Sequence, residues 1–206
     1  MSANSFENNR DDYASYSRTR ILDAAVRCLV ELGYSASSTV EIQKMAGFSR
    51  GRLLYYFPSK DSLLIAAAQH LAAGRVQETG LAAAAEMTAE PGSPTRVDQA
   101  IEVMWQTYQQ PYFWASVELW IAARHNADIG VALRPAERTL YATIADVVDD
   151  LFGVEFTAHP SYRLIRELLL TSMRGVAMTY SFNPRDPSAD HHLQVWKHAA
   201  HTLLDT

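Results

Sequence analysis

The chain has 206 residues, 48% of them hydrophobic and 20% charged, which is enough to bury a core and excludes a largely disordered protein. No eighteen uncharged apolar residues follow one another, and the polar start MSANSFENNRDD lacks the apolar stretch of a secretion signal. We therefore expect a cytoplasmic protein with no membrane segment. The single cysteine, Cys28, excludes an internal disulfide and a Cys-based zinc finger, and we expect a buried, inert thiol.

The net charge of -5 is unevenly distributed. Residues 1–75 hold nine Lys or Arg and seven Asp or Glu, whereas residues 76–206 hold nine and sixteen. Residues 38–60 contain four basic side chains and only one acidic side chain. The acidic total excludes a uniformly basic coat for nucleic acid, but this short segment has the local charge that phosphate contacts need.

Residues 1–16 are predicted to form a polar tail. From there on apolar side chains recur at three- and four-residue spacing, and we expect an all-α fold. The first helix ends at Gly33, which suits a left-handed C-cap. Its apolar stripe consists of Ile21, Leu22, Ala25, Leu29 and Leu32.

Two short helices joined by a tight turn are predicted next. Ser38 and Glu41 have the spacing of a capping box that opens the first of them. Gly47 permits a tight turn after this helix, and Ser49 is placed to cap the next one at residues 50–57. A helix that leaves such a turn at a steep angle presents its outer face, so the spacing predicts a helix-turn-helix.

A fourth helix is capped by Ser59 and is expected from residue 60 to about residue 73. The turn-rich segment 90–95 then opens a second part of the chain. Its five helices are expected at residues 96–109, 112–124, 127–152, 162–182 and 189–204. These elements predict a three-helix helix-turn-helix domain at residues 17–62, joined to a larger helical domain at residues 63–206, in which we expect ligand binding and dimerisation.

The second short helix has a face suited to duplex DNA. Leu53 and Phe57 lie one turn apart and are expected to face inward together with Leu54. The outward residues are Arg50, Gly51, Arg52 and Tyr55. Arginine can donate paired bonds to guanine O6 and N7, glycine lets the backbone approach, and tyrosine can touch a thymine methyl or a phosphate. Lys60 opposes the dipole of the helix that it opens, a conflict that a bound phosphate would remove.

The segment SSTVEIQKMAGFSRGRLLYYFPSKDSLL, residues 37–64, resembles the DNA-binding signature of the tetracycline-repressor (TetR) family. The resemblance implies contacts with the phosphate backbone and, at the start of the second short helix, with bases. The implied DNA contacts fall on Ser38, Thr39, Ser49, Arg50, Gly51, Arg52, Tyr56 and Lys60. The chain departs from the usual family residues at Gln43, Arg52 and Leu54, which leaves the operator sequence open.

Aromatic residues are concentrated between residues 104 and 120. At helical spacing they could line a small-molecule pocket between helices, although ordinary core packing is favoured for any one of them. The candidate pocket residues are Met104, Trp105, Tyr108, Phe113, Trp114, Glu118 and Trp120. Glu118 could meet a cationic or hydroxylated ligand, but pairing with Arg124 or simple exposure is favoured.

The last two predicted helices carry apolar side chains that would be partly exposed in a monomer. The resemblance implies that they pair with their twofold mates in a four-helix bundle, so we expect a homodimer, with Trp196 as a candidate anchor. The candidate interface residues are Leu164, Leu168, Thr171, Val176, Leu193, Trp196, Ala200 and Leu203.

Four histidines near the C-terminus raise the question of a metal site. They are His191, His192, His198 and His201. We favour a solvated surface or a dimer rim, because no carboxylate that would close such a site can be assigned, and we expect neither a metal nor a cofactor. The chain also has no phosphate-binding loop and no dinucleotide fingerprint, so we do not expect an enzyme.

These patterns predict a sequence-specific DNA-binding transcription regulator. The resemblance implies a homodimeric repressor that binds a near-palindromic operator in double-stranded DNA and is released by an unidentified small-molecule effector. The alternative is a helix-turn-helix regulator with no small-molecule effector, controlled by a partner protein or by its own abundance.

Overall fold

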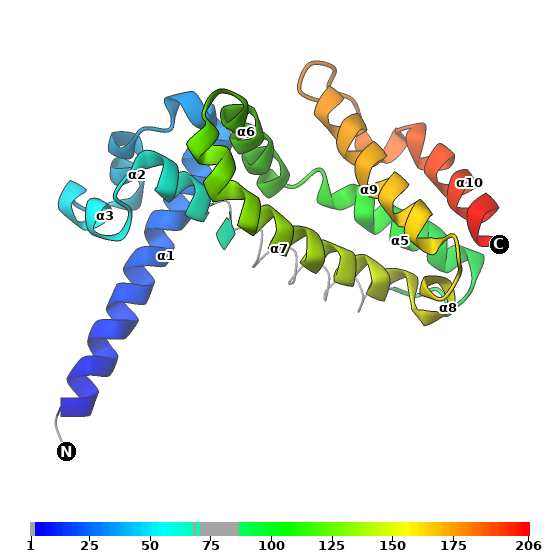
Figure 1. The fold of residues 1–206 in the computed structure, drawn as a ribbon, viewed down its shortest axis with the longest axis horizontal. Coiled ribbons are helices and arrows are strands. Elements are labelled where there is room, and N and C mark those ends of the chain that lie inside the picture. The colour runs from blue at the N-terminus through cyan, green and yellow to red at the C-terminus, as the bar shows by residue number, and fades with distance from the viewer. Residues whose placement is uncertain (1–2, 68, 71–86) are drawn as a thin grey trace. The chain divides into compact units, whose positions relative to one another are not determined.

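The computed structural model describes residues 3–67, 69–70 and 87–206. Every regular element in these residues is helical (Figure 1), which confirms the all-α prediction. The helices are α1 (Ala3–Ala36), α2 (Thr39–Ala46), α3 (Arg50–Tyr56), α5 (Pro94–Thr107), α6 (Pro111–His125), α7 (Ala127–Phe152), α8 (Val154–Thr157), α9 (Tyr162–Thr179) and α10 (His192–Leu204). Residues 60–67 and 69–70 are also helical. Within the described ranges no helix combines the length and apolar character that crossing a membrane requires.

Helix α1 differs from the prediction at its start. It begins at Ala3, so the segment expected as a polar tail is helical from its third residue onward. The first glycine or proline of the chain is Gly33, so no helix-breaking residue precedes it. At Gly33 the backbone leaves helical geometry (φ 73°, ψ 171°), which confirms that the regular part of the first helix ends there.

The elements of the second part lie close to their predicted positions. Helix α7 has the predicted bounds, whereas α9 ends at Thr179, three residues before the predicted end. Helix α10 begins at His192 instead of residue 189, because Pro187–Ala189 forms a 3-10 turn. Asp186 stabilises this turn by accepting a hydrogen bond from the Ser188 amide at 2.9 Å.

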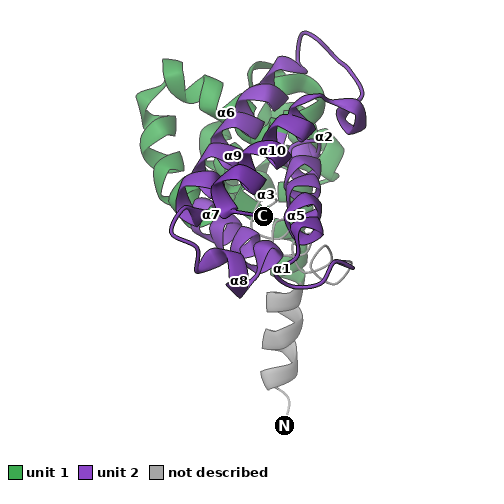
Figure 2. Ribbon diagram, turned by 90° about the vertical axis from the view of Figure 1, so that its right-hand side faces the viewer, with its two compact units in different colours: residues 1–74, 114–140 green, residues 75–113, 141–206 purple. Residues whose placement is uncertain are grey.

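The chain divides into two compact units (Figure 2): unit 1 contains residues 1–74 and 114–140, and unit 2 contains residues 75–113 and 141–206. This division differs from the predicted boundary between residues 62 and 63. The reason is that α6 and the first half of α7 share a core with α1. Their contributions to that core are Ala115, Leu119, Ala122, Ile129 and Leu133.

The core of unit 1 is built on the predicted apolar stripe of α1. Ile21, Leu22 and Leu29 are completely buried, together with Leu53 of α3. Full burial of such a side chain contributes about 1.5–3 kcal/mol, so this core holds the short helices in place. Cys28 is buried as expected, and burial raises the pKa of its thiol.

In unit 2, α10 packs against α5 and α9. The ring of Trp105 on α5 lies 5.0 Å from that of Trp196 on α10 and 5.7 Å from that of Tyr180, centroid to centroid. The indole N–H of Trp105 donates a hydrogen bond to the Pro187 carbonyl at 2.9 Å, and the Tyr108 hydroxyl donates to the Leu170 carbonyl at 2.9 Å. These bonds satisfy the polar atoms of otherwise apolar core residues.

Candidate DNA-binding site

The turn between α2 and α3 has the predicted capping residues. The Ser38 hydroxyl accepts a hydrogen bond from the Glu41 amide at 3.2 Å, and the Ser49 hydroxyl accepts one from the Arg52 amide at 3.3 Å. Gly47 adopts the left-handed conformation (φ 73°, ψ 26°), which an L side chain would strain. Local sequence therefore determines where both helices of the helix-turn-helix begin.

Helix α3 has one buried face and one exposed face. Leu53 is completely buried and Phe57 is 4% exposed, whereas Tyr55 is 82% exposed. The prediction that Leu54 faces inward is wrong, since this side chain is 40% exposed. A step of one residue turns a helix by about 100°, and the buried face of α3, which carries Leu53 and Phe57 one turn apart, is narrow enough to leave Leu54 exposed.

The start of α3 is accessible, as base contacts would require. Arg50 and Gly51 are exposed. A Cβ at Gly51 would meet no atom of the chain within 4 Å, so the packing of the chain does not explain a glycine there. Arg52 is half-buried because its guanidinium packs on the rings of Tyr13 and Phe48.

The sequence prediction overlooked Tyr13. This residue was placed in the polar tail, yet α1 carries it to α3, where its hydroxyl accepts a hydrogen bond from Arg52 Nη1 at 3.2 Å. Tyr13, Tyr16 and Arg20 have the i, i+3, i+7 spacing of one helical face. That spacing was the available signal that the first helix continues toward the N-terminus.

Lys60 lies at the C-terminal end of α1. Its ammonium donates hydrogen bonds to the carbonyls of Tyr34 at 2.6 Å and Ser35 at 3.3 Å, and it lies 4.4 Å from the centroid of the Tyr34 ring. Burial lowers the pKa of Lys60, while nearby Asp61 acts in the opposite direction. Carbonyls at a helix C-terminus attract a cation. The structure therefore gives Lys60 a partner within the chain, whereas the sequence suggested only a phosphate.

Glu118 of α6 caps the end of α1. Its carboxylate accepts a hydrogen bond from the Tyr34 amide at 2.8 Å, a partner that the sequence did not suggest. A Cβ at Gly33 would lie 3.0 Å from the same carboxylate, so glycine also permits this approach. The Tyr34 hydroxyl donates to Asp61 at 2.6 Å, and burial together with this bond raises the pKa of Tyr34 to about 12.

The seven candidate pocket residues do not fall in one unit. Met104, Trp105, Tyr108 and Phe113 belong to unit 2, and Trp114, Glu118 and Trp120 belong to unit 1. The first four are buried, with the rings of Tyr108 and Phe113 in edge contact at 5.3 Å. Trp120 is half-buried against the core of unit 1. The burial of the first four residues agrees with the ordinary core packing that was favoured for the aromatic cluster.

The candidate dimer residues also separate into two groups. Leu164, Leu168 and Thr171 are exposed on α9, while Val176, Leu193 and Leu203 are half-buried. Trp196 and Ala200 are buried within unit 2, and the Trp196 indole donates a hydrogen bond to Ser172 at 2.9 Å. The expectation that Trp196 anchors a partner is therefore not supported, because its own unit already surrounds it.

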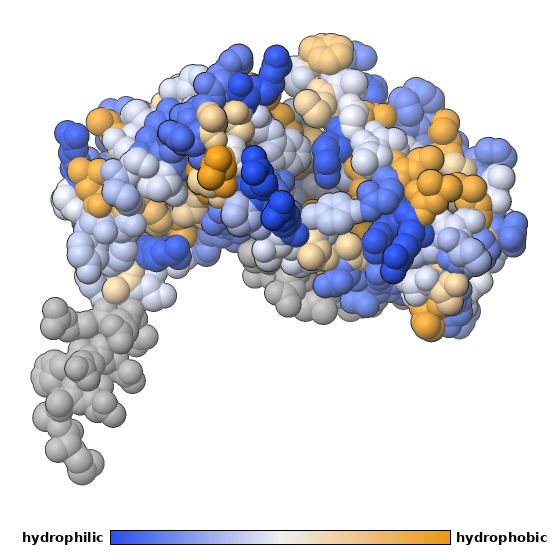
Figure 3. Space-filling model, in the orientation of Figure 1, coloured by the Kyte–Doolittle hydropathy of each residue, from blue (hydrophilic) through white to orange (hydrophobic). Residues whose placement is uncertain are grey.

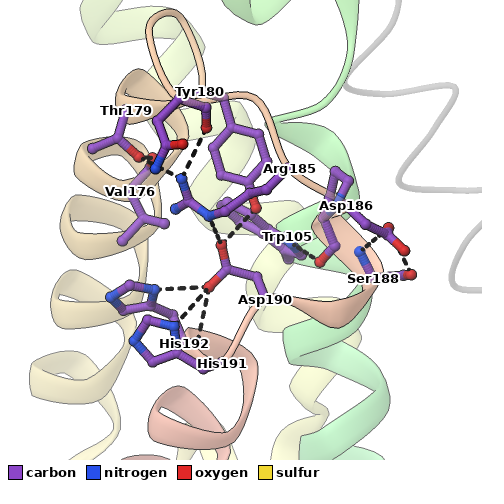
Figure 4. A network of polar contacts seen from close by, with 12 residues as sticks. Trp105, Val176, Thr179, Tyr180, Arg185, Asp186, Ser188, Asp190, His191 and His192 are labelled. Atoms are coloured by element: carbon purple, nitrogen blue, oxygen red, sulfur yellow. Dashed lines mark hydrogen bonds and ion pairs between the residues drawn. The ribbon is translucent and has the colours of Figure 1, made fainter.

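The connection between α9 and α10 is organised around a buried carboxylate (Figure 4). Asp190 accepts hydrogen bonds from Tyr180 at 2.5 Å, from Arg185 at 2.9 Å, and from both the backbone and the ring of His192 at 2.9 and 2.8 Å. Asp190, His191 and His192 form a group of residues of the types that bind metal ions. Both carboxylate oxygens already accept hydrogen bonds, so we interpret the group as a structural connection.

Comparisons with known proteins agree with the geometry of α2 and α3. The family model "Bacterial regulatory proteins, tetR family" matches residues 21–67. The chain is 31% identical over 148 residues to the transcriptional repressor AcnR of Corynebacterium glutamicum. The aligned residues cover 71% of this chain and 67% of that protein. It is 39% identical over 57 residues to the transcriptional regulator RutR of Escherichia coli K12, which covers 28% of this chain and 27% of that protein.

Solved structures share the fold over nearly the whole chain. GusR of Salmonella enterica superposes with a TM-score of 0.63 at 21% identity, covering 92% of this chain and 96% of that one. The multidrug binding protein EbrR, solved with imidazole, has a TM-score of 0.60 at 18% identity, covering 90% and 93%. FadR of Bacillus subtilis, solved with stearoyl-CoA, has a TM-score of 0.55 at 19% identity, covering 90% and 96%.

The curated relatives named above are transcription regulators, in line with the expectation that this chain is not an enzyme. The capped helix-turn-helix lies within the matched residues. The chain therefore belongs to the TetR family of bacterial regulatory proteins and is a DNA-binding transcription regulator.

Proposed function

We propose that the protein is a homodimeric repressor that binds a near-palindromic operator and is released by a small-molecule effector. The observation that carries the DNA-reading part is the outer face of α3. Arg50, Gly51 and Tyr55 are exposed there, and the core residue Leu53 holds the helix from the opposite side. A rigid helix that presents arginines at its N-terminal end suits the major groove.

Base reading is assigned to Arg50 and Arg52, with Tyr55 beside them. Backbone contacts with phosphate are assigned to Ser38, Thr39, Ser49, Tyr56 and Lys60. The amides at the start of α2 support this assignment, since helix N-termini favour anions. Among the described residues Lys60 donates two hydrogen bonds, and an ammonium has three donors, so a third donor can meet a phosphate.

Dimerisation is assigned to the outer faces of α9 and α10. Leu164 is 60% exposed, Leu168 is 39% exposed and Met178 is 41% exposed, at spacings that place them along one face of α9 with Thr171. On α10, Val195 is 54% exposed. Figure 3 shows apolar side chains gathered over this part of unit 2. An apolar helix face left in water favours pairing with a second copy.

The effector is proposed by analogy with neighbours of the same fold. FadR and EbrR were solved with small molecules, as described above. Within unit 1, Glu118 of α6 accepts a hydrogen bond from the Tyr34 amide, and Asn126, between α6 and α7, donates one to Asp61. A change at α6 would therefore reach the end of α1. A coupling of about 1–3 kcal/mol between two sites changes affinity roughly 5- to 150-fold, which is enough to regulate.

The test is to select binding sequences from random duplexes with the purified protein, followed by mobility shifts at two salt concentrations. We expect an inverted repeat bound by a dimer, with log affinity falling linearly with log salt. Failure to enrich any sequence would contradict sequence-specific binding. A thermal-shift screen of small molecules, followed by release from the selected operator, then tests the effector. If no molecule releases the DNA, the regulator without a small-molecule effector becomes the better description.

A further inference from the structure

An aromatic and guanidinium stack joins α1 to α3. The Arg52 guanidinium carbon lies 4.5 Å from the ring centroid of Tyr13 and 5.3 Å from that of Phe48. Arg52 Nη1 also donates a hydrogen bond to the Tyr13 hydroxyl at 3.2 Å. The side chain assigned to base reading is therefore held by two rings and one hydroxyl before any DNA is bound.

Burial does not account for the position of Tyr13. Its side chain is 54% exposed, so it fills no space in the core of unit 1. The favourable interaction that its side chain makes is the contact with Arg52, in which the electron-rich ring face attracts the guanidinium. A residue so placed affects the state of Arg52 more than the stability of the unit.

Holding Arg52 in advance has a physical consequence for binding. An unrestrained arginine loses the freedom of several side-chain torsions when it binds a base, and a stacked guanidinium loses less. The hydrogen bond to Tyr13 occupies one of the five N–H donors of the guanidinium. The remaining donors can still form paired bonds to guanine O6 and N7.

We propose that Tyr13 is a positioning residue for sequence recognition: it pre-organises Arg52, so the N-terminal part of α1 belongs to the machinery that reads duplex DNA. This inference rests on the proposed base-reading role of Arg52. It assigns function to a segment before residue 21, where the match to the family model begins.

The chain offers a matched control in Tyr16. It lies on the same helix and is also 54% exposed, but its hydroxyl accepts a hydrogen bond from Arg20 at 3.3 Å instead of from Arg52. Substitution of either tyrosine by alanine removes a similarly exposed side chain from the same helix. Of the two substitutions, only that of Tyr13 removes contacts with Arg52.

The experiment is sequence selection from random duplexes with the full-length wild type and the variants Arg52→Ala, Tyr13→Ala, Tyr13→Phe and Tyr16→Ala. We expect Arg52→Ala to lose preference at a particular base pair of each half-site. Tyr13→Ala then lowers discrimination at that same base pair by roughly two- to fivefold, the range for an exposed cation–π contact. Tyr13→Phe retains most of the preference because it keeps the ring, and Tyr16→Ala leaves that base pair unchanged.

Two further readouts separate positioning from a purely structural role. The variant Tyr13→Ala/Arg52→Ala should show no loss at that base pair beyond Arg52→Ala alone, because one residue acts through the other. Thermal unfolding should show Tyr13→Ala and Tyr16→Ala shifted alike. Should Tyr13→Ala fail to fold, Tyr13→Leu replaces it, since leucine is a good helix former without a ring face or hydroxyl.

The possible failures are distinct. If Tyr13→Ala selects the wild-type sequence while Arg52→Ala does not, the inference is overturned and the proposed function stands. A uniform loss of affinity for all sequences in Tyr13→Ala also overturns the inference. If Arg52→Ala changes no base pair, Arg52 is not a reader and the inference falls with that assignment. If the wild type enriches no sequence, the proposed function itself fails.

Discussion

The carboxylate of Glu118 on α6 accepts a hydrogen bond from the backbone amide of Tyr34, with an N–O distance of 2.8 Å. The bond joins residues 84 positions apart in the sequence. It ties the end of α1 to a helix beyond the DNA-binding segment, within unit 1.

Removing this bond should lower stability. We expect Glu118→Ala to reduce the free energy of unfolding by about 1–3 kcal/mol, because the Tyr34 amide loses its acceptor. Glu118→Gln keeps an acceptor oxygen and should cost less. Glu31→Ala, at an exposed position of α1, is the control and should stay within about 0.5 kcal/mol of wild type in urea denaturation. Equal losses in Glu118→Ala and Glu31→Ala would contradict the capping role.

Lys60 is expected to serve both the fold and the DNA. Lys60→Gln should weaken binding to all sequences alike and reduce the slope of log affinity against log salt by about one, because one phosphate contact is lost. It should also lower stability, since the carbonyls of Tyr34 and Ser35 lose their donor. Lys60→Arg retains the charge and should keep the slope. A slope unchanged in Lys60→Gln would show that Lys60 acts only within the chain.

Tyr55 separates binding from stability. Its side chain is 82% exposed, so Tyr55→Ala should change the free energy of unfolding by no more than about 0.5 kcal/mol. Operator affinity should fall roughly tenfold, about 1.4 kcal/mol, because a base or phosphate contact is lost. Leu54→Ala, at the neighbouring exposed position, is the comparison in mobility-shift titrations. If both variants bind as tightly as wild type, this part of α3 does not face the DNA.

The dimer surface can be tested with a charge. Leu168→Glu places a carboxylate in the exposed apolar face of α9, so it should shift the protein from dimer to monomer in analytical ultracentrifugation. Val154→Glu is the matched control, because Val154 is 74% exposed on α8 of the same unit. A dimer that survives Leu168→Glu would place the interface on another surface.

Asp190 should make stability depend on pH in the acid range. Burial acts to raise the pKa of Asp190, but hydrogen bonds from Tyr180, His192 and Arg185 outweigh it and hold the pKa well below the ordinary value of 3.8. A carboxyl with a depressed pKa stabilises the fold above its unfolded pKa and loses that contribution as pH falls.

The corresponding variant is Asp190→Asn. At pH 7 it should lower the free energy of unfolding by about 1.5–3 kcal/mol, because hydrogen bonds to a charged acceptor are lost. The difference from wild type should shrink as pH falls below the ordinary value of 3.8. Asp150→Asn, at an exposed position of unit 2, should show neither effect. A difference that is constant between pH 7 and pH 3 would contradict the depressed pKa.

Local signals in the sequence predicted the helix-turn-helix well. The caps at Ser38 and Ser49 and the left-handed turn at Gly47 each depend on residues within four positions of one another. Such contacts form at the ends of a helix between residues near in sequence, so their spacing can be recognised before the fold is known. The same holds for α7, whose apolar periodicity predicted both of its ends.

The partners of individual side chains were not predictable in this way. Sequence reasoning named Glu118 as a pocket candidate, although it favoured pairing with Arg124 or exposure, and it named Trp196 as a candidate dimer anchor. The fold instead places Glu118 beside Tyr34 and surrounds Trp196 with Trp105 and Ser172. An apolar or acidic residue on a helix can face any neighbour, and only packing decides which one.

By itself, then, the sequence determined the helices, the turn chemistry and the class of DNA-binding regulator, because these follow from short-range spacing and from a motif within residues 37–64. Tertiary structure alone decided that α6 shares a core with α1, that Lys60 and Glu118 both bind the end of α1, and that Tyr13 reaches Arg52. The hydrogen bonds among these contacts join residues that are between 25 and 84 positions apart in the sequence. At such separations the geometry depends on how whole helices pack, and no local pattern encodes it.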